Sequence, residues 1–160
     1  MSTEFNKPEL PALGILAALD DADRRLLSDY GEFLPVQADA QLIEEGSPQN
    51  SLYFVISGVL HVTTDVDGKR TLISRAEPGE TIGEVSVFDP GKASATVHAQ
   101  EFCQVWRASR EDIDAFLASY PEAAGRLLLG MLGVLCGRLR NTTEKLTAKE
   151  QQVALRYLYQ

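Results

Sequence analysis

The sequence has few of the side chains on which metal binding and nucleophilic catalysis depend. It contains two histidines and two cysteines, and neither Cys103 nor Cys136 belongs to a C-x-x-C pair or to another metal-ligand spacing. We therefore expect two buried free thiols and no metal site. Nucleophile elbows, H-E-x-x-H motifs and P-loops are also absent, so the sequence predicts a protein that is not an enzyme and has no catalytic residues.

Long runs of one kind of side chain are missing as well. No apolar stretch approaches the ~18 residues of a membrane span, and the N-terminal segment M-S-T-E-F-N-K-P lacks an apolar signal region. No run of lysines or arginines offsets the net charge of −8, which disfavours nucleic acid and anionic membranes as partners of this chain alone. A cytoplasmic protein is the default expectation.

With 160 residues, of which 44% are hydrophobic and 24% charged, the chain matches one globular domain over residues 1–160. We expect residues 1–32 to form an N-terminal helical part. It would begin with a loose polar arm to about residue 10, followed by a short apolar helix around residues 13–16. Asp20 and Asp21 then open an amphipathic segment, and we interpret these acids as the solvated first turn of a helix rather than as metal ligands.

From Phe33 to about Trp106, helical periodicity gives way to short apolar runs separated by turn signals. These signals are G-S-P at 46–48, S-G at 57–58, D-G at 67–68, P-G at 78–79 and P-G at 90–91. Strands at this spacing indicate an antiparallel roll or barrel over residues 33–107. The D-G pair predicts the clearest hairpin, and we assign no chemical role to His61 or His98.

Helical periodicity returns over residues 108–160. Ser109 is a predicted N-cap with Asp112 three residues later, and Pro121 suits the first position of a further helix. We expect this second helix to continue to about Tyr159, which is longer than one small domain needs. Three glycines at helical spacing weaken it, which suggests a backbone approached closely by the roll or by a partner helix. They are Gly130, Gly133 and Gly137.

The long helix carries two apolar sides. One side follows alternating steps of three and four residues when Thr142 and Lys149 are counted as polar interruptions, which is the spacing of a two-stranded coiled-coil seam. The opposite side of its first half is apolar too, so one side can meet the roll and the other a second subunit. A monomer whose helix covers only its own roll is the alternative. The seam residues are Leu128, Leu132, Leu135, Leu139, Leu146 and Val153, and the opposite side has Leu127, Met131 and Val134.

The segment Pro78–Val97 reads P-G-E-T-I-G-E-V-S-V-F-D-P-G-K-A-S-A-T-V and places Glu84 directly after Gly83. A glycine that begins a short helix lets successive N–H groups point into one concavity, which is a natural anion seat. Glu84 within it would accept hydrogen bonds from ligand hydroxyls. An ordinary turn is the alternative interpretation of these residues.

This segment resembles the phosphate-binding cassette of cyclic-nucleotide-binding domains, as found in Crp/Fnr regulators and in regulatory subunits of cyclic-nucleotide-dependent kinases. The resemblance extends upstream through L-I-x-x-G at 42–46, L-Y-F-V-I-S-G-V-L-H-V at 52–62 and D-G-K-R-T-L-I at 67–73. It implies an α+β fold: an antiparallel β-roll of the double-stranded β-helix or jelly-roll type, with N-terminal helices, a cassette over residues 79–97 and a long C-terminal dimerisation helix. Cyclic AMP or cyclic GMP is the implied ligand, with no other cofactor. The implied apolar wall for its base is Val62, Ile73 and Ala76, for which core packing is the alternative role.

One departure separates this sequence from the family. The position of the arginine that pairs with the cyclic phosphate in the family is matched by Ala93, and the neighbouring Lys92 cannot reproduce a planar guanidinium. The loss should weaken binding by on the order of 2–4 kcal/mol, which is roughly 30-fold to 1000-fold. If the cassette were empty and closed, Glu84 would be buried without a cationic partner. The ligand-binding residues that the resemblance implies are Ile82, Gly83, Glu84, Val85, Lys92, Ala93, Ser94, Ala95, Thr142 and Thr143, the two threonines through R-L-x-x-T-T-E-K.

The sequence thus predicts a non-catalytic regulatory module that resembles a cyclic-nucleotide sensor with weakened ligand binding, and a homodimer formed through the C-terminal helix. Two alternatives stay open. One is a ligand-free, dimeric protein-interaction module. The other is the excised sensor half of a Crp/Fnr transcription regulator, because the family's helix-turn-helix domain does not follow before Gln160.

Overall fold

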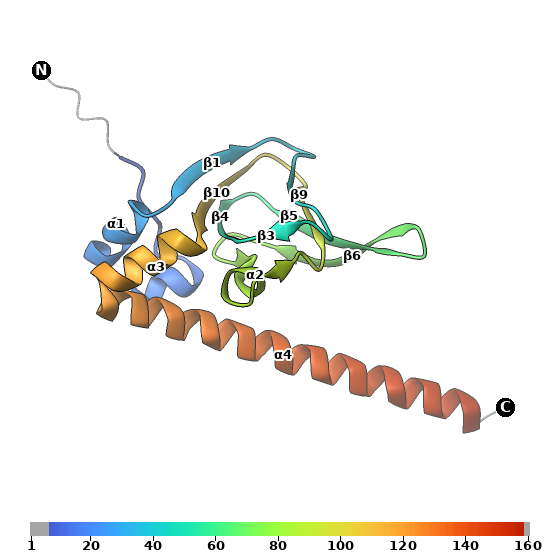
Figure 1. The fold of residues 1–160 in the computed structure, drawn as a ribbon. Coiled ribbons are helices and arrows are strands. Elements are labelled where there is room, and N and C mark those ends of the chain that lie inside the picture. Colours follow the sequence, from blue (N-terminus) through green and yellow to red (C-terminus); the bar gives the residue numbers. More distant parts are fainter. Residues whose placement is uncertain (1–6, 159–160) are drawn as a thin grey trace, which may run out of the picture.

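The computed structural model describes residues 7–158, in which short β-strands form a roll and most of the helices gather at one end of it (Figure 1). The first elements are the 3-10 helix η1 (Gly14–Ala18) and the helix α1 (Asp21–Ser28). Asp20 caps α1, since its carboxylate accepts a hydrogen bond of 2.8 Å from the backbone N–H of Asp23. The two predicted N-terminal helices are therefore present.

The expected loose arm over residues 1 to about 10 lies mostly outside the described residues, but its end is not loose. Leu10 is buried in the core beside Leu27, and its N–H donates a hydrogen bond of 2.9 Å to Ser28 Oγ. The apolar side chain of Leu10 supplies the reason, because burial of one leucine is worth about 1.5–3 kcal/mol.

Two four-stranded antiparallel sheets make up the roll. The first has the order β1-β10-β4-β7 and the second the order β2-β9-β5-β6, so strands far apart in the sequence lie side by side. The first sheet consists of β1 (Glu32–Val36), β10 (Cys103–Ser109), β4 (Ser51–Ser57) and β7 (Thr81–Ile82). The second consists of β2 (Gln41–Ile43), β9 (Thr96–Ala99), β5 (Leu60–Val66) and β6 (Lys69–Ala76).

The turn signals have two outcomes. Asp67 and Gly68 connect β5 to β6 with φ of 54° and 76°, the positive values of a type I′ hairpin turn, as predicted. Pro48 and Gly91, in contrast, belong to short paired strands, β3 (Pro48–Gln49) and β8 (Gly91–Lys92). The turn signal at 46–48 does mark a turn, since Ser47 N–H donates to the carbonyl oxygen of Glu44 at 3.1 Å and Gly46 has a φ of 82°. Pro48 itself begins a strand, because edge pairing tolerates a proline at that position.

The C-terminal part contains α3 (Arg110–Ser119) and the long helix α4 (Pro121–Leu158). Ser109 and Asp112 form a capping box at the start of α3, as the sequence predicts. The first turns of α4 pack on η1 and α3, where Gly130 lies close enough to η1 that an added Cβ would be 3.4 Å from Ile15 Cβ. From residue 139 onward every described residue of α4 is exposed, and Figure 1 shows this half extending past the roll.

Two apolar clusters hold the molecule together. One joins the helices to the first sheet and includes Trp106, Phe54 and Phe116, while the other fills the roll around Val55 and Leu60. The α+β roll with a long C-terminal helix is therefore confirmed. Among residues 7–158 no helix is both long and apolar enough to cross a membrane, and no acidic, histidine or cysteine side chains gather to hold a metal ion.

The cysteines differ in environment. Cys103 is buried, its thiol donates to the carbonyl oxygen of Val59 at 3.4 Å, and burial raises its pKa. Cys136 is exposed, so the prediction of two buried thiols was wrong for this residue. The reason is its place on α4, because it points away from the side of the helix on which Met131 packs against η1 and the first sheet.

Candidate functional site

Gly83 precedes the cassette helix at a position where the backbone conformation favours glycine. Gly83 lies between β7 and the short helix α2 (Glu84–Phe88) with φ of 83°, a left-handed conformation that other residues rarely adopt. A Cβ at this position would lie 2.3 Å from the carbonyl oxygen of Ser51. The chain therefore turns sharply here and places Glu84 at the first position of α2, where it is buried.

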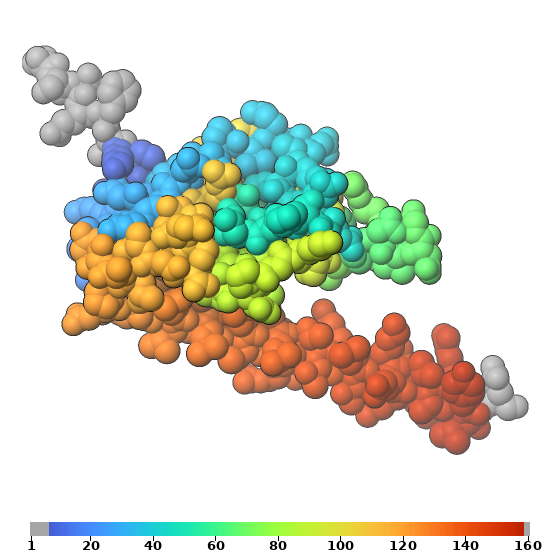
Figure 2. Space-filling model, in the orientation of Figure 1, coloured from blue at the N-terminus to red at the C-terminus, as the bar shows by residue number. Residues whose placement is uncertain are grey.

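A cavity of about 460 Å³ opens between the cassette, the roll and α4. Figure 2 shows the molecule hollowed between the green β5–β6 hairpin and the orange to red helix α4. This volume is within the usual range for a small-molecule site. The lining residues come from β-strands, from the cassette and from one side of α4, so the cavity is bordered by both halves of the fold.

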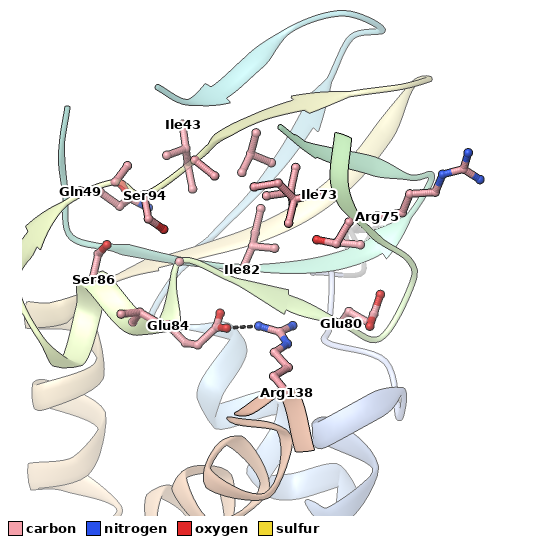
Figure 3. Close-up of a pocket in the computed structure, with 18 of the residues that line it drawn as sticks. Ile43, Gln49, Ile73, Arg75, Glu80, Ile82, Glu84, Ser86, Ser94 and Arg138 are labelled. Atoms are coloured by element: carbon pink, nitrogen blue, oxygen red, sulfur yellow. Dashed lines mark hydrogen bonds and ion pairs between the residues drawn. The ribbon is translucent and has the colours of Figure 1, made fainter. Parts of the chain in front are cut away.

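An ion pair crosses the cavity from α4 to the cassette (Figure 3). Arg138 donates a hydrogen bond from Nη1 to Glu84 Oε1 and another, of 2.7 Å, from Nη2 to the carbonyl oxygen of Thr81. The Glu84 side chain is 6% exposed and that of Arg138 is 41% exposed. An unpaired Glu84 was expected only for an empty, closed cassette; in this structure the cassette borders an open cavity, and the long helix supplies Glu84 with a cationic partner.

Glu84 keeps one free acceptor. Its second oxygen, Oε2, is buried and has no hydrogen-bond partner among residues 7–158. A buried carboxylate oxygen without a donor is costly, since desolvation of a charged group is repaid only by hydrogen bonds. Glu84 Oε2 is therefore an acceptor to which a hydroxyl or amino group could donate.

The far end of the cavity is apolar. Ala93 is 7% exposed, its N–H donates to the carbonyl oxygen of Ser47 at 2.9 Å, and its own carbonyl accepts from Gly46 N–H at 2.8 Å. These bonds fix the Ala93 backbone beside the cavity, where the neighbouring lining side chains Ile43 and Val97 are also buried and apolar. No guanidinium or ammonium group is supplied from this position.

Charged groups line the cavity elsewhere. Its cations among the described residues are Arg75, Arg138 and Lys145, and its carboxylates are Glu80 and Glu84. In Figure 3 the guanidinium of Arg75 points away from the other labelled side chains, whereas that of Arg138 points to Glu84. Positive charge inside the cavity therefore comes from α4 and not from the cassette.

The structure brings most of the predicted ligand-binding residues to this cavity. The apolar wall of Val62, Ile73 and Ala76 also lines it. The predicted residues that line it are Ile82, Gly83, Glu84, Val85, Ala93, Ser94, Ala95 and Thr142.

Two predicted residues do not line the cavity. Lys92 is exposed on β8 and borders a separate shallow hollow with Pro48 and Pro90, because its strand pairs with β3 at the molecular edge. Thr143 donates its hydroxyl to the carbonyl oxygen of Leu139 at 3.0 Å. It follows Thr142 by one residue, which rotates it about 100° around α4 and away from this cavity.

Arg138 is the residue that the sequence interpretation missed. It lies one helical turn before Thr142, and the spacing of four residues places both on the same side of a helix. Asn141 and Lys145 belong to the same side and line the cavity with them. The signal was therefore present in R-L-x-x-T-T-E-K, whose first letter is Arg138.

Comparison with known proteins agrees with this geometry. The model of the cyclic nucleotide-binding domain family matches residues 33–120. The chain is 30% identical over 112 residues to the cAMP-activated global transcriptional regulator CRP of Haemophilus influenzae, covering 69% of this chain and 48% of that protein. It is 28% identical over 128 residues to the Pycsar effector protein BcPycTIR of Burkholderia cepacia, covering 79% of this chain and 40% of that protein.

A solved structure supports the same assignment. The cyclic nucleotide-binding domain from Methylobacillus flagellatus KT superposes with a TM-score of 0.76 at 26% sequence identity, covering 82% of this chain and 74% of that one. The chain spans less than half the length of the two curated relatives it matches, at 48% and 40%. With the roll, the cassette and the family match in agreement, the chain belongs to the cyclic nucleotide-binding domain family.

Proposed function

We propose that this chain is a non-catalytic sensor module in which a small ligand occupies the cavity and α4 reports its presence. The observation that carries the proposal is the bond from Arg138 of α4 to Glu84 of the cassette. A ligand that forms hydrogen bonds with Glu84 or Arg138 would change the contact between the cassette and α4. Such a ligand shifts the equilibrium between two positions of α4 only if it binds one of them more tightly, and the shift is limited by that difference in affinity.

Cyclic nucleotides are the ligand that the family suggests, with weak affinity in this chain. The buried Glu84 Oε2 suits a sugar hydroxyl, and the wall of Val62, Ile73 and Ala76 suits a base. Ala93 offers no charge to a cyclic phosphate, and Arg138 already donates to Glu84 and Thr81. A charge-assisted bidentate contact is therefore missing, which accounts for an expected loss of about 30-fold to 1000-fold in affinity.

Calorimetric titration with cyclic AMP and cyclic GMP tests this function. We expect weak or undetectable binding to the wild type and a gain in Ala93→Arg. An Ala118→Arg variant is the matched control, because it adds the same charge at an exposed position of α3. Hydrogen exchange of the Ala93→Arg variant then measures the response, and unchanged protection of residues 134–146 at saturating ligand would contradict a sensor role.

The proposal includes a homodimer formed through α4. Leu139, Leu146 and Val153 are 69%, 59% and 47% exposed, although they continue the apolar seam of the helix. The exposed C-terminal half of α4 has no cover within the described chain, and a long apolar seam is normally covered by a second helix.

A second candidate function keeps the dimer and drops the ligand. Ala93 favours this protein-interaction module, because the family's phosphate contact is absent from the cassette. The free Glu84 Oε2 and the open cavity favour the sensor. As part of a longer protein, either module would pass its state to another domain, as the names of the relatives, a transcriptional regulator and an effector, suggest.

A further inference from the structure

The charged side chains around the cavity balance one another. The carboxylates of Glu80 and Glu84 are matched by Arg138 and Lys145, and in Figure 3 the guanidinium of Arg75 points away from the other labelled side chains. Glu80 and Lys145 are exposed and form no ion pair among residues 7–158, so water screens both charges. Among the described lining residues, a charged ligand of either sign therefore finds no buried, uncompensated counter-charge.

The buried part of the cavity offers a hydrogen bond instead of a charge. Glu84 Oε2 is buried, has no partner among residues 7–158 and can only accept, while Arg138 already neutralises the carboxylate. A second cation at this oxygen would leave a positive charge in excess, and an anion would be repelled by it. A neutral hydroxyl group donates to Glu84 Oε2 without adding charge to a buried site.

Uncharged polar groups continue on the roll side of the cavity. The side-chain amide of Gln49 donates to the carbonyl oxygen of Ser51 at 2.7 Å, which leaves its Oε1 atom able to accept. A planar ring with apolar faces and polar edges suits a lining that mixes such groups with apolar side chains. The other uncharged polar lining residues of the roll and cassette are Ser74, Ser86 and Ser94, and the buried apolar ones include Ile43, Ile82 and Val97.

From this lining we infer that the ligand of the cavity is an uncharged nucleoside rather than a nucleotide. Its base lies on the roll side, against the apolar wall, and a sugar hydroxyl donates to Glu84 Oε2. A cyclic phosphate bound as the family resemblance implies would lie at Ala93, which is 7% exposed and whose N–H already donates to Ser47. The inference rests on the proposed sensor function and names the chemical class of its ligand.

Nucleosides and their cyclic phosphates test whether the ligand is uncharged. Adenosine with cyclic AMP, and guanosine with cyclic GMP, are titrated calorimetrically into the wild type and Ala93→Arg. Because a phosphate beside Ala93 is desolvated without a cation, we expect at least one nucleoside to bind the wild type about tenfold more tightly than its cyclic nucleotide. The order should reverse in Ala93→Arg, since the added guanidinium favours only the cyclic nucleotide. If no nucleoside binds the wild type more tightly than its cyclic nucleotide, the inference is wrong.

The contact of the sugar hydroxyl is tested from both of its partners. The compound 2′,3′-dideoxyadenosine lacks the two vicinal hydroxyls and should bind the wild type about tenfold more weakly than adenosine, because a hydrogen bond to a charged group is lost. Glu84→Gln should weaken adenosine to a similar extent, with no further loss for the dideoxy compound. Glu80→Gln removes an exposed carboxylate that also lines the cavity and should leave both affinities unchanged. Equal binding of the two compounds by the wild type would overturn the inference, whether or not Glu84→Gln folds.

The same titrations separate this inference from the proposed function. If the wild type binds cyclic AMP or cyclic GMP and neither nucleoside, the sensor function stands and the ligand class is wrong. If only Ala93→Arg binds, and it binds only a cyclic nucleotide, the ligand class is again wrong. If neither the wild type nor Ala93→Arg binds any of these compounds, both the sensor function and the ligand class are wrong, and the ligand-free module takes their place.

Discussion

Arg138, in the middle of α4, donates a hydrogen bond to the buried carboxylate of Glu84 at the start of the cassette helix α2. The two residues are 54 positions apart in the sequence. Their contact joins the long helix to the cassette at the edge of the cavity. It also neutralises the carboxylate that the cassette buries, so the fold holds Glu84 without a ligand.

Replacing Arg138 by glutamine should destabilise the protein. Glu84 would stay buried without its cation, and leaving such a group unsatisfied costs about 1–3 kcal/mol. We place the expected loss toward the lower end, because the Arg138 side chain is 41% exposed and water screens the pair. Urea unfolding at pH 7 measures the loss against Arg140→Gln, an exposed arginine two residues away that should change little. Equal stability of the two variants would contradict a supporting role for the pair.

Gly83→Ala should lower the free energy of unfolding more than Gly68→Ala does. Gly68 is the control, because its φ of 76° is close to the 83° of Gly83 but nothing lies within 4 Å of its added Cβ. Both variants carry the left-handed strain of about 1–2 kcal/mol. Only Gly83→Ala also meets the Ser51 carbonyl oxygen at 2.3 Å. A free energy of unfolding that falls equally in both variants would show that the cassette relaxes without cost.

His98 should make the folded state less stable as the solution becomes acidic. Burial lowers its pKa, as do Arg70 and His61 nearby, while Asp39 acts in the opposite direction. The unfolded chain, with a histidine pKa of about 6.5, then binds more protons than the native state, so stability falls as the pH drops through about 6.5.

The His98→Gln variant isolates this effect. Its free energy of unfolding should improve relative to the wild type between pH 7.5 and pH 5.5, and its difference from the wild type at pH 8 should report packing alone. A difference that is constant with pH would show that His98 titrates normally in the folded protein.

The apolar seam of α4 should decide the oligomeric state. Multi-angle light scattering should give a dimer for the wild type and a monomer for Leu135→Asp and Leu139→Asp, because a charge in a coiled-coil seam is buried without a partner. Ala148→Asp adds the same charge on the exposed side of the helix and should keep the dimer. An unchanged dimeric mass in the leucine variants would remove the seam as the contact.

The fold was predictable from the sequence where local signals and burial agree. Asp67-Gly68 specifies its own turn, Ser109 and Asp112 cap their helix, and Pro121 begins α4, all without long-range information. The β3–β8 pairing was not predictable, since Pro48 and Gly91 read as turn residues and pair only because the roll brings them together.

The sequence predicted the cassette of the candidate site but not the positions of its charged side chains. The cassette motif identified Gly83, Glu84 and Ala93, and all three line the cavity. Which residue pairs with Glu84 depends on how α4 crosses the roll, and no local sequence pattern specifies this, so Arg138 was overlooked. Lys92 was predicted to bind the ligand but lies outside the cavity. Charge placement inside a cavity is a property of tertiary structure.

Calorimetric titration of the wild type and the Ala93→Arg variant with cyclic AMP tests the central claim most directly. The claim is that the cavity keeps the family's shape but lacks positive charge at its roll end. It predicts that the added guanidinium lowers the dissociation constant by about 30-fold to 1000-fold. Tight binding by the wild type, or no gain in a folded Ala93→Arg variant, would contradict it.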